Sequence, residues 1–353
     1  MDETHRSLVS QQVASFEAVR EEWEVLAYRT RNVFATWEWN AAWWTHFAGS
    51  KSPLVTTCRS PEGRLVAVLP LYLWRKRPLR IVRFLGHDAA DQLGPICLPE
   101  DRPAVAGALG EVLSSLRTDI FVAEHLSCDE GWSARLQASE LGRESSPVLR
   151  YPTPTWSEFL QARSRNFREQ ARRREAKLAE RFDVRFRLAN DAEQLDRDLD
   201  ALFRLHRARW EGGRTTFARA EAFQREFAAR ALERGWLRLW FLEVDRRPRA
   251  ACYGFRFGDV ESFYQGGRDP AWNEHSVGFI VLVHAIREAL SDGMVEYRLL
   301  RGDEPYKNRF ANEDHGLETV AITRTAMSRR ALQLAVAARR SKALKRATGL
   351  LRR

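Results

Sequence analysis

The stretch that decides the fold begins YQGGRDPAWNEHSVGFIVLVHAIREAL at Tyr264 and closes with YRLLRGDEPYKNRF at Phe310. It predicts a strand, a loop, a helix, a second strand and a polar loop, in that order. The segment 277–290 is apolar on nearly every side, and a helix that is apolar all round is a buried helix. Gly293 marks its end. The sequence therefore predicts a fold built around one buried helix.

The start of that helix has the composition of an anion site. Ser276 stands where an N-cap belongs, so its hydroxyl is expected to accept hydrogen bonds from the first free N–H groups. Gly278 lets a ligand or another backbone come close. Free N–H groups and the helix dipole both attract an anion there. Ser-x-Gly also occurs in ordinary buried helices, so the pattern permits either a phosphate site around Ser276, Val277 and Gly278 or simple packing.

The loop after the second strand carries a dense set of polar side chains. They are Asp303, Glu304, Tyr306, Lys307 and Arg309. Burying them is costly unless they pair with one another, so they form either a network or a site. As a network, Lys307 would form a salt bridge with Asp303. As a site, a carboxylate would orient or deprotonate an amine while Lys307 and Arg309 hold an anion, and the loop would share one cleft with Tyr264 and Gln265.

The order of these motifs resembles the CelD-type acetyltransferases associated with cellulose biosynthesis, a family of the GNAT superfamily related to the FemAB peptidyltransferases. The resemblance extends from about residue 34 to residue 325, and the block from Tyr264 to Phe310 is its most specific part. The segments that carry it upstream are Thr36–Trp39 with Trp43 and Trp44, Phe84–Gly86 with Asp91, Gly94 and Pro95, and the basic stretch Arg163–Arg174.

The resemblance implies an α+β fold of tandem GNAT-like domains, each a mostly antiparallel sheet flanked by helices. Strand and helix patterns recur in the same order in both halves of the sequence, which agrees with such a fold. The expected first half is residues 1–150. The expected second half, which would bind acyl-CoA and be catalytic, is residues 156–325. Residues 151–155, with two prolines, are the expected linker, and a basic helical tail is expected over residues 326–353.

The resemblance also implies transfer of an acetyl or other acyl group from acyl-CoA, as co-substrate, to an amine on a sugar, a peptide or a cell-envelope or polysaccharide precursor. Three sets of candidate residues follow from it. The catalytic candidates are Asp303, Tyr306 and His275. The acyl-CoA candidates are Gln265, Ser276, Val277, Gly278, Lys307 and Arg309. The acceptor candidates are Tyr264, Arg165, Asn166, Arg168 and Trp39.

Several of these candidates have a purely structural alternative. The tryptophans around Trp39 carry large apolar surfaces and are equally explained by core packing. The basic stretch from Arg163 is either a solvated face or a clamp whose guanidinium groups match phosphate oxygens. His206 lies on an apolar helical stripe, and we expect it to be a hydrogen-bonded core histidine. His275 borders the loop before the buried helix and is the histidine placed to accept a proton.

Two other functions remain open at this stage. A FemAB-like enzyme would transfer an aminoacyl group from a charged tRNA, and its basic helix and tail would contact the RNA backbone. A non-catalytic scaffold of a polysaccharide-synthesis system would keep the fold without the chemistry. The motifs of P-loop NTPases, Rossmann dehydrogenases, zinc hydrolases and serine esterases are missing from the sequence.

Composition limits the remaining classes. The 353 residues, 44% of them hydrophobic, are enough for two domains. No apolar run reaches the ~18 residues that span a bilayer. The first residues lack a signal-peptide pattern, so a cytoplasmic protein is expected. The four cysteines show neither CxxC spacing nor histidine partners, so neither disulfides nor a metal site is expected.

The net charge of +10 comes from the tail. Ten Lys or Arg and no acid lie between Arg324 and Arg353, which leaves the rest of the chain balanced. Nucleic acid is therefore not an expected partner, except tRNA in the FemAB-like alternative. One helical face of the tail would carry Leu332, Val336, Ala343, Ala347 and Leu351. This pattern predicts weak binding to an anionic membrane at the inner face, or else a helix docked on the body or a disordered basic end.

Overall fold

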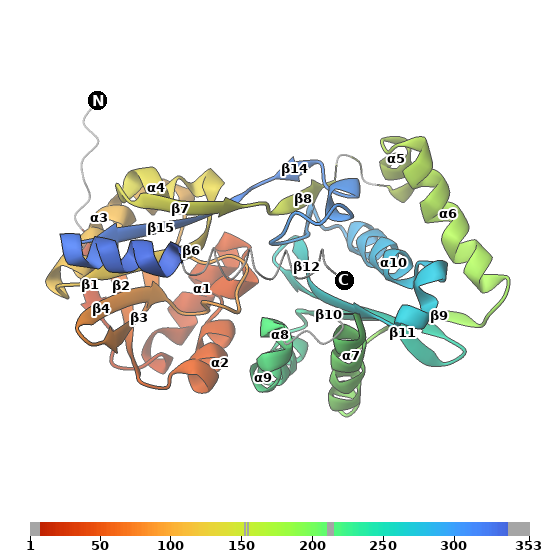
Figure 1. Ribbon diagram of the computed structural model, residues 1–353, viewed down its shortest axis with the longest axis horizontal. Helices are drawn as coiled ribbons and strands as arrows, with labels where there is room; N and C mark the ends of the chain where they lie inside the picture. The colour runs from red at the N-terminus through yellow and green to blue at the C-terminus, as the bar shows by residue number, and fades with distance from the viewer. Residues whose placement is uncertain (1–7, 152, 154, 210–214, 338–353) are drawn as a thin grey trace.

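The structure is a computed structural model that describes residues 8–151, 153, 155–209 and 215–337. Two twisted sheets lie side by side along the long axis of the molecule, each with helices packed on it (Figure 1). The α+β architecture expected from the sequence, two sheets flanked by helices, is confirmed.

The first sheet is mixed, and its strands run in the spatial order β1-β2-β3-β4-β6-β15-β7, with β5 beside β3. Its strands are β1 (Val9–Gln12), β2 (Lys51–Arg59), β3 (Leu65–Lys76), β4 (Leu79–Phe84), β5 (Ile96–Cys97), β6 (Ile120–Ser127), β7 (Ser139–Glu144) and β15 (Leu317–Thr323). The helices of this half are α1 (Arg20–Thr30), α2 (Trp37–Phe47), α3 (Arg102–Ser115) and α4 (Trp132–Arg135). Among the described strands of this sheet, β4 and β6 are the one pair that runs in parallel.

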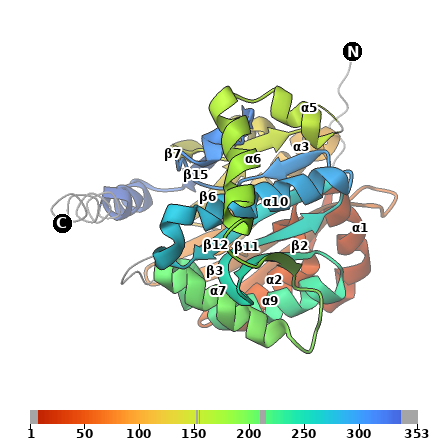
Figure 2. The ribbon, with the colours of Figure 1, turned by 90° about the vertical axis from the view of Figure 1, so that its right-hand side faces the viewer.

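The second sheet follows the order β14-β8-β13-β12-β11-β10-β9. Its strands are β8 (Pro147–Arg150), β9 (Val184–Leu188), β10 (Leu237–Val244), β11 (Arg247–Phe257), β12 (Val260–Arg268), β13 (Glu296–Arg298) and β14 (Glu313–Asp314). Helices α5 (Trp156–Gln161), α6 (Arg165–Ala179) and α10 (Val277–Ser291) cover one face (Figures 1 and 2). Helices α7 (Leu195–Arg209), α8 (Thr216–Arg219) and α9 (Glu221–Glu233) cover the other. The predicted buried helix is α10, and its core-facing side chains are almost completely inaccessible.

The same unit occurs once in each half. In the first half, the antiparallel strands β2, β3 and β4 are followed by α3 and by β6, which pairs in parallel with β4. In the second half, the antiparallel strands β10, β11 and β12 are followed by α10 and by β13, which pairs in parallel with β12. The recurrence expected from the sequence is therefore present in three dimensions.

The two sheets exchange strands. β8, at the end of residues 1–150, joins the second sheet between β13 and β14. β15, near the end of residues 156–325, returns to the first sheet between β6 and β7. The boundary between the sheets therefore does not fall at residues 151–155, and each half contributes one strand to the sheet of the other.

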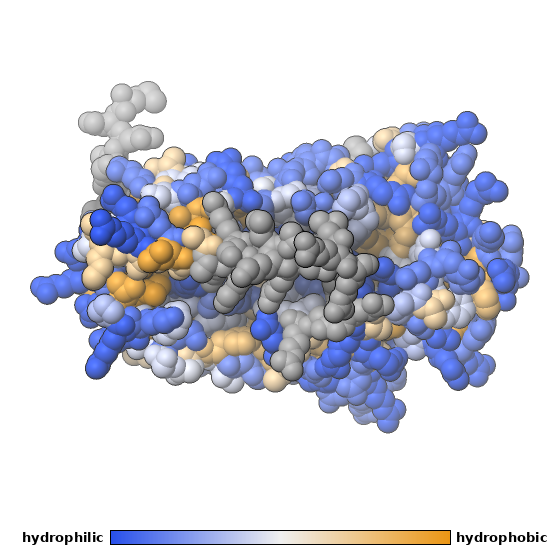
Figure 3. Space-filling model, in the orientation of Figure 1, coloured by the Kyte–Doolittle hydropathy of each residue, from blue (hydrophilic) through white to orange (hydrophobic). Residues whose placement is uncertain are grey.

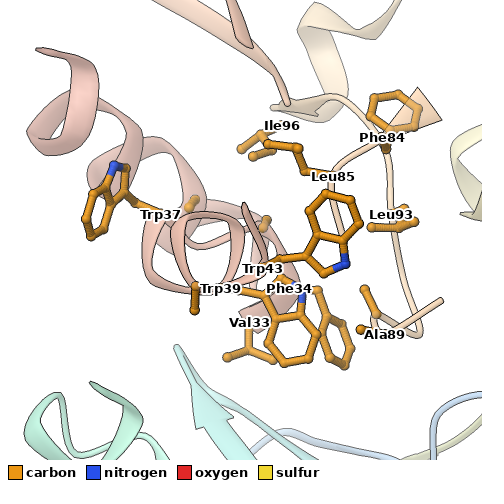
Figure 4. Close-up of a cluster of buried hydrophobic side chains, with 14 of the residues drawn as sticks. Val33, Phe34, Trp37, Trp39, Trp43, Phe84, Leu85, Ala89, Leu93 and Ile96 are labelled. Atoms are coloured by element: carbon orange, nitrogen blue, oxygen red, sulfur yellow. The ribbon is translucent and has the colours of Figure 1, made fainter. Parts of the chain in front are cut away.

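The tryptophans near the N-terminus form part of the core. Trp23, Trp39 and Trp43 are 0–1% exposed. Figure 4 shows Trp39 lying against Phe34 inside a cluster of apolar side chains, while Trp37 points to the other side of α2. The rings of Phe227 and Phe223, from α9 of the second half, lie 4.6 and 4.9 Å from that of Trp39. The core of the first half is therefore continuous with one face of the second sheet.

The beginning of the tail is helical over residues 326–337 and projects from the body (Figure 2). Leu332 packs against Ile120, Val122 and Ala321 of the first sheet, and Ser328 is fully buried. Figure 3 shows apolar surface beside this helix at the left end of an otherwise mostly hydrophilic face. The rest of the expected apolar stripe, Ala343, Ala347 and Leu351, lies outside the described residues. Among the described residues, no helix combines the length and hydropathy needed to cross a membrane.

Candidate active site

The candidate site lies where β12 and β13 separate. The two strands pair in parallel only at Val260–Ser262 and Glu296–Arg298. β12 continues to Arg268, and no other described strand pairs with that edge. A cavity of about 380 Å³ opens there, bounded by β11, β12, the start of α10 and the loop carrying Tyr306–Phe310. Backbone groups along the open edge of β12 are thus available to a ligand.

Irregular backbone shapes this edge. The register of β11 and β12 shifts between Tyr253 and Gly254, which leaves Tyr264 as an extra residue, as in a β-bulge. Gly266 and Gly267 follow and line the cavity. A Cβ atom on Gly267 would lie 2.5 Å from the carbonyl carbon of Leu205 in α7. Glycine is therefore required for α7 to pack directly on this strand.

The start of α10 forms the wall opposite β12. Ser276 has φ 57° and ψ 35°, and its carbonyl oxygen accepts from the N–H groups of Phe279 and Ile280. The N–H groups of Val277 and Gly278 come before these first helical bonds, where α-helices have unpaired donors. The expected capping bond from the Ser276 hydroxyl does not form, because its backbone is left-handed and not in the extended region that caps use.

Four arginines surround the cavity, one from each of four segments. They are Arg174 of α6, Arg209 of α7, Arg268 of β12 and Arg309 of the short 3-10 helix Lys307–Arg309. In the part of the chain that the structure describes, no Asp or Glu lines the cavity. Guanidinium groups match the oxygens of phosphates and carboxylates, so this wall is suited to a ligand with several negative charges.

The electrostatics of these arginines show an excess of positive charge. Burial lowers the pKa of Arg174, and the nearby charge of Arg309 lowers it further. Burial likewise lowers the pKa of Arg268, with Arg209 as the second cause. Arg268 donates to Asn273 Oδ1 at 2.7 Å and Arg309 donates to Gln170 Oε1 at 2.7 Å, both neutral amides. A bound anion would relieve this repulsion.

Tyr306 brings a buried phenol hydroxyl to the cavity. Its ring lines the cavity, and burial raises its pKa to about 12. The phenol is therefore protonated at neutral pH and can donate a proton or a hydrogen bond, but is poorly suited to act as a base. Burial also raises the pKa of the Cys252 thiol to about 12, so this lining cysteine is not a reactive thiolate.

Four of the sequence candidates meet in this cavity: Ser276, Gly278, Tyr306 and Arg309. Val277 is fully buried in the core beside them. Lys307 is buried, and its ammonium group donates to the carbonyl oxygen of Arg301 at 2.5 Å and pairs with Glu304 at 2.9 Å. The structure thus makes Lys307 a member of a network, with Glu304 as its partner where Asp303 was expected.

Three other candidates lie away from the cavity. Asp303 is exposed, outside the cavity lining. His275 packs against Trp272, with 5.1 Å between the ring centroids, and its Nε2 lies 3.2 Å from the neighbouring Glu274. Gln265 pairs with Tyr253, so it shares the face of the sheet turned toward α7. The geometry therefore gives no direct role in the cavity to these three.

The expected acceptor residues are also elsewhere. The Tyr264 hydroxyl donates to the carbonyl oxygen of Ala89 at 2.6 Å and joins the two halves on the face opposite α10. The expected convergence of Tyr264 and Gln265 with Tyr306 and Arg309 is therefore wrong, because the bulge turns Tyr264 toward the first half. Trp39 is a core residue, as its structural alternative predicted.

The basic helix contributes to the cavity through a different residue from those expected. Arg165 is 86% exposed and pairs with Glu169. Asn166 accepts from Gln170, and Arg168 donates to the carbonyl oxygens of Gln161 and Arg163. None of these three lines the cavity, whereas Arg174, further along α6, does. A 3.6-residue period marks the apolar stripe of this helix but does not tell which turn reaches the cavity.

A second cavity, of about 340 Å³, occupies the first half near the start of α3. It is lined by Arg29, Arg31 and Arg102 but also by Glu130, which lies 3.2 Å from Arg102. Glu100 and Asp101 occupy the turn before α3. Acidic groups at a helix start oppose anion binding, so this cavity is not an electrostatic copy of the first.

Among the described residues, no group of three or more His, Cys, Asp or Glu is placed to hold a metal ion.

The family comparison covers the half that contains the arginine-lined cavity. Residues 165–308 match the family model described as "Acetyltransferase (GNAT) domain". The second half carries a GNAT-type acetyltransferase domain. This match supports an acyltransferase, and it ends two residues after Tyr306. No curated protein matches the sequence significantly.

Solved structures share the whole two-sheet fold. FemX aligns with a TM-score of 0.64 at 10% identity, over 93% of this chain and 100% of that chain. The C-terminal domain of a putative lysylphosphatidylglycerol synthetase from Agrobacterium fabrum aligns with 0.58 at 13%, over 90% and 96%. L-PGS from Bacillus licheniformis aligns with 0.55 at 11%, over 90% and 94%. At these identities the likeness shows the GNAT-like fold.

Proposed function

We propose that this protein is an acyl-CoA-dependent N-acyltransferase whose donor lies in the cavity of the second half. The observation that carries the proposal is the set of Arg174, Arg209, Arg268 and Arg309 around a cavity that is lined by no carboxylate of the described residues. Coenzyme A carries a pyrophosphate, and the start of α10 at Gly278 offers free N–H groups to it. The open edge of β12 offers backbone partners to the extended pantetheine arm, as an added strand would find.

The chemistry follows from the same arrangement. The amine nitrogen attacks the thioester carbon, the carbon–sulfur bond breaks, and an amide and a thiol are formed. N–H groups on the open edge of β12 would polarise the thioester carbonyl. Tyr306, protonated at neutral pH, would give its proton to the departing sulfur, and the proton lost by the amine would replace it. Among the described residues, no histidine or carboxylate lines the cavity, so with these residues the amine must arrive unprotonated or lose its first proton to water.

The acceptor that we propose is an amine on a sugar, a peptide or an envelope or polysaccharide precursor, as in CelD-type enzymes. A second candidate function is aminoacyl transfer from charged tRNA. It is favoured by Arg172, Arg173 and Lys177, which are exposed on α6 beside the cavity residue Arg174. RNA bound there would be released steeply by salt, because each phosphate contact frees counterions. A scaffold without chemistry is the third alternative.

Isothermal titration with acetyl-CoA and with bulk tRNA separates these functions. We expect acetyl-CoA to bind the wild-type protein at one site, and Gly278→Asp to abolish this binding. An added side chain there starts 3.3 Å from Arg268 Cδ, and its carboxylate would compete with the donor phosphates. Binding of tRNA alone would favour aminoacyl transfer, and binding of neither would favour a scaffold. Unchanged acetyl-CoA binding by a folded Gly278→Asp protein would contradict the proposed placement.

We also propose that the tail brings the protein to anionic membranes. Arg329 and Arg330 are exposed on its described helix, and Met327 and Leu334 are 59% and 72% exposed. Cationic residues near an anionic lipid surface contribute about 1 kcal/mol each. Flotation with phosphatidylglycerol vesicles at low and high salt, for the full chain and for a chain ending at Ile322, tests the proposal. Equal flotation of both proteins would contradict it.

A further inference from the structure

Arg301 of the second half reaches into the first half. Its guanidinium donates to Nε2 of His125 at 2.7 Å. It also lies 3.7 Å from Asp91 Oδ1 and 3.5 Å from Glu144 Oε2. His125 belongs to β6, Asp91 to the loop after β4 and Glu144 to β7, so three separate segments of the first half hold this one side chain. None of these groups lines the cavity of the second half.

His125 is held in an unusual conformation. It has φ 56°, in the left-handed region that non-glycine residues avoid, although it lies within a strand. Its Nδ1 lies 3.0 Å from the carbonyl oxygen of Ala90, and its own carbonyl oxygen accepts from Leu93. Because the carbonyl can only accept, Nδ1 carries the proton and Nε2 is free to accept from Arg301. Strained residues of this kind persist where the surroundings fix them.

Asp91 requires Arg301. Its side chain is 10% exposed, and Arg301 is the cation within ion-pair distance of it among the described residues. A buried carboxylate that loses its cation is left with an unpaired charge, which costs more than an exposed pair would. Removal of Arg301 would therefore weaken the contact between the two halves by more than the loss of an exposed ion pair would.

The segment that follows Arg301 leads directly into the cavity. The N–H of Gly302 donates to the carbonyl oxygen of Ser145 in the first half at 2.9 Å. The ammonium group of Lys307 donates to the carbonyl oxygen of Arg301 at 2.5 Å. Tyr306 lies between these two fixed points and lines the cavity. The position of Tyr306 is therefore set partly by the first half.

We propose that His125 and Asp91 of the first half are positioning residues, which hold segment 300–306 through Arg301 so that Tyr306 faces the reacting thioester. This inference rests on the proposed acyltransferase function. It gives the first half a role in the reaction without a ligand of its own. A misplacement of about 1 Å at a catalytic group costs as much as 100-fold in rate, so a rigid clamp of this kind has a measurable effect.

The test compares Arg301→Met and His125→Asn with a matched control. Asn tolerates a left-handed backbone but is too short to reach Arg301 as His125 does. The control is Asp259→Asn, which removes another ion pair between the halves, with Arg31 at 2.8 Å. We expect thiol release from acetyl-CoA to fall about 10- to 100-fold in the two clamp variants, with the dissociation constant for acetyl-CoA within about threefold of wild type. Asp259→Asn should resemble wild type in both.

Hydrogen exchange makes the result independent of the assigned chemistry. Amides of segment 300–306 should exchange faster in Arg301→Met and His125→Asn, and at the wild-type rate in Asp259→Asn. Should wild type fail to bind acetyl-CoA, the proposed function fails while exchange still tests the clamp. Unchanged exchange in both clamp variants overturns the inference. If either clamp variant does not fold, Arg301→Lys, which keeps a charge near Asp91 without the guanidinium fork, takes its place.

The pH profile distinguishes positioning from a general structural role. The charged groups that face His125 are Arg301, Asp91, Glu124 and Glu144. Protonation of Nε2 would turn it into a donor that faces the donor of Arg301, and their hydrogen bond would be lost. Thiol release in wild type should therefore fall on the acid side. His125→Asn should have a lower plateau and an acid limb set by protonation of the amine alone, which is shallower than that of wild type. An acid limb identical to that of wild type would overturn the role of His125.

Discussion

The guanidinium carbon of Arg309 lies 4.9 Å from the ring centroid of Phe279. Arg174 approaches the same ring at 5.0 Å. Phe279 stands in the first turn of α10, so one apolar side chain at the helix start orders two cations that come from distant segments. The attraction of a cation to an aromatic face offsets part of the repulsion between the two arginines. The positive cavity is thus organised by a ring as well as by charges.

Replacing Phe279 with Ala should weaken acetyl-CoA binding about 10-fold. Each cation–π contact contributes about 0.5–1 kcal/mol, and two are lost together, so the loss of about 1–2 kcal/mol brackets this value. Phe279→Leu keeps most of the apolar packing and loses the π-face, so it separates the two effects. Isothermal titration of the three proteins measures the change, and equal affinities in Phe279→Ala and wild type would show that the ring does not order the arginines.

Arg268→Ala should lower acetyl-CoA affinity by about 10- to 100-fold, the value of one charged hydrogen bond. Arg165→Ala is the control, because Arg165 is 86% exposed and pairs only with Glu169 among the contacts described for it. Its affinity should match that of wild type. The dependence of affinity on salt should also become shallower in Arg268→Ala, since one cation has been removed from the cavity. Equal losses of affinity in both variants would show that binding depends on the overall positive charge of the surface and not on Arg268 itself.

Tyr306→Phe should lower turnover more than donor affinity. The ring and its packing remain, but the proton that Tyr306 would give to the departing sulfur is lost. A reduction of about 100-fold in thiol release is therefore expected. Acetyl-CoA affinity should change by less than about threefold. Thiol release and titration measure the two quantities separately. Full activity of Tyr306→Phe would remove the phenol from the mechanism.

Gly267→Ala should destabilise the fold. Its Cβ would lie 2.5 Å from the carbonyl carbon of Leu205, so α7 would have to move away from β12 at a cost of at least about 1–3 kcal/mol. Gly107→Ala is the control, because Gly107 is an exposed helical residue with nothing within 4 Å of the added atom. It should be neutral or stabilising by up to about 1 kcal/mol. Urea unfolding followed by circular dichroism compares the two.

How far the sequence predicts this molecule depends on the range of the contacts involved. The buried helix and the recurring unit follow from local patterns, whereas Ser276, Gly278 and Arg309 are grouped by the resemblance and not by any local signal. The exchange of β8 and β15 between the sheets does not follow from local patterns, because strand pairing across more than 100 residues leaves no local signal. For the same reason Arg174 and Arg209 were missed, although both belong to helices that the pattern predicts.

The errors at Tyr264 and Lys307 have a different cause. A period of two places successive strand residues on opposite faces, and the bulge before Gln265 breaks that period. Tyr264 therefore faces the first half. Lys307 has the residue type of a ligand-binding cation, but its ammonium group donates to backbone carbonyl oxygens just before its own loop. Composition shows that a loop is polar and does not show which of its groups pair with each other.

His284 provides a prediction about acid stability. Its ring stacks on Phe186, with centroids 3.8 Å apart, and stands edge-on to Trp240 at 4.6 Å. Nδ1 accepts from Arg287 at 3.0 Å, and Nε2 is buried without a hydrogen-bond partner among the described residues. Burial, with the charge of Arg287 as a second cause, lowers the pKa of His284 to about 4. Protonation would therefore place a second charge beside Arg287 in an apolar stack.

The sign of the effect on stability follows from that pKa. An unfolded histidine titrates near 6.5, so between about pH 6.5 and pH 4 the unfolded chain binds a proton that folded His284 does not. The free energy of unfolding should then be constant above this window and fall as the pH is lowered through it. His284→Phe keeps an aromatic ring in the stack, and its unfolding should take up about one proton fewer at pH 5. Urea unfolding of both proteins from pH 7 to pH 4.5 measures this difference. All other titrating groups are common to the two proteins, including His206, whose pKa burial also lowers to about 4. Equal slopes of stability against pH would therefore show that His284 is not kept neutral by its stack.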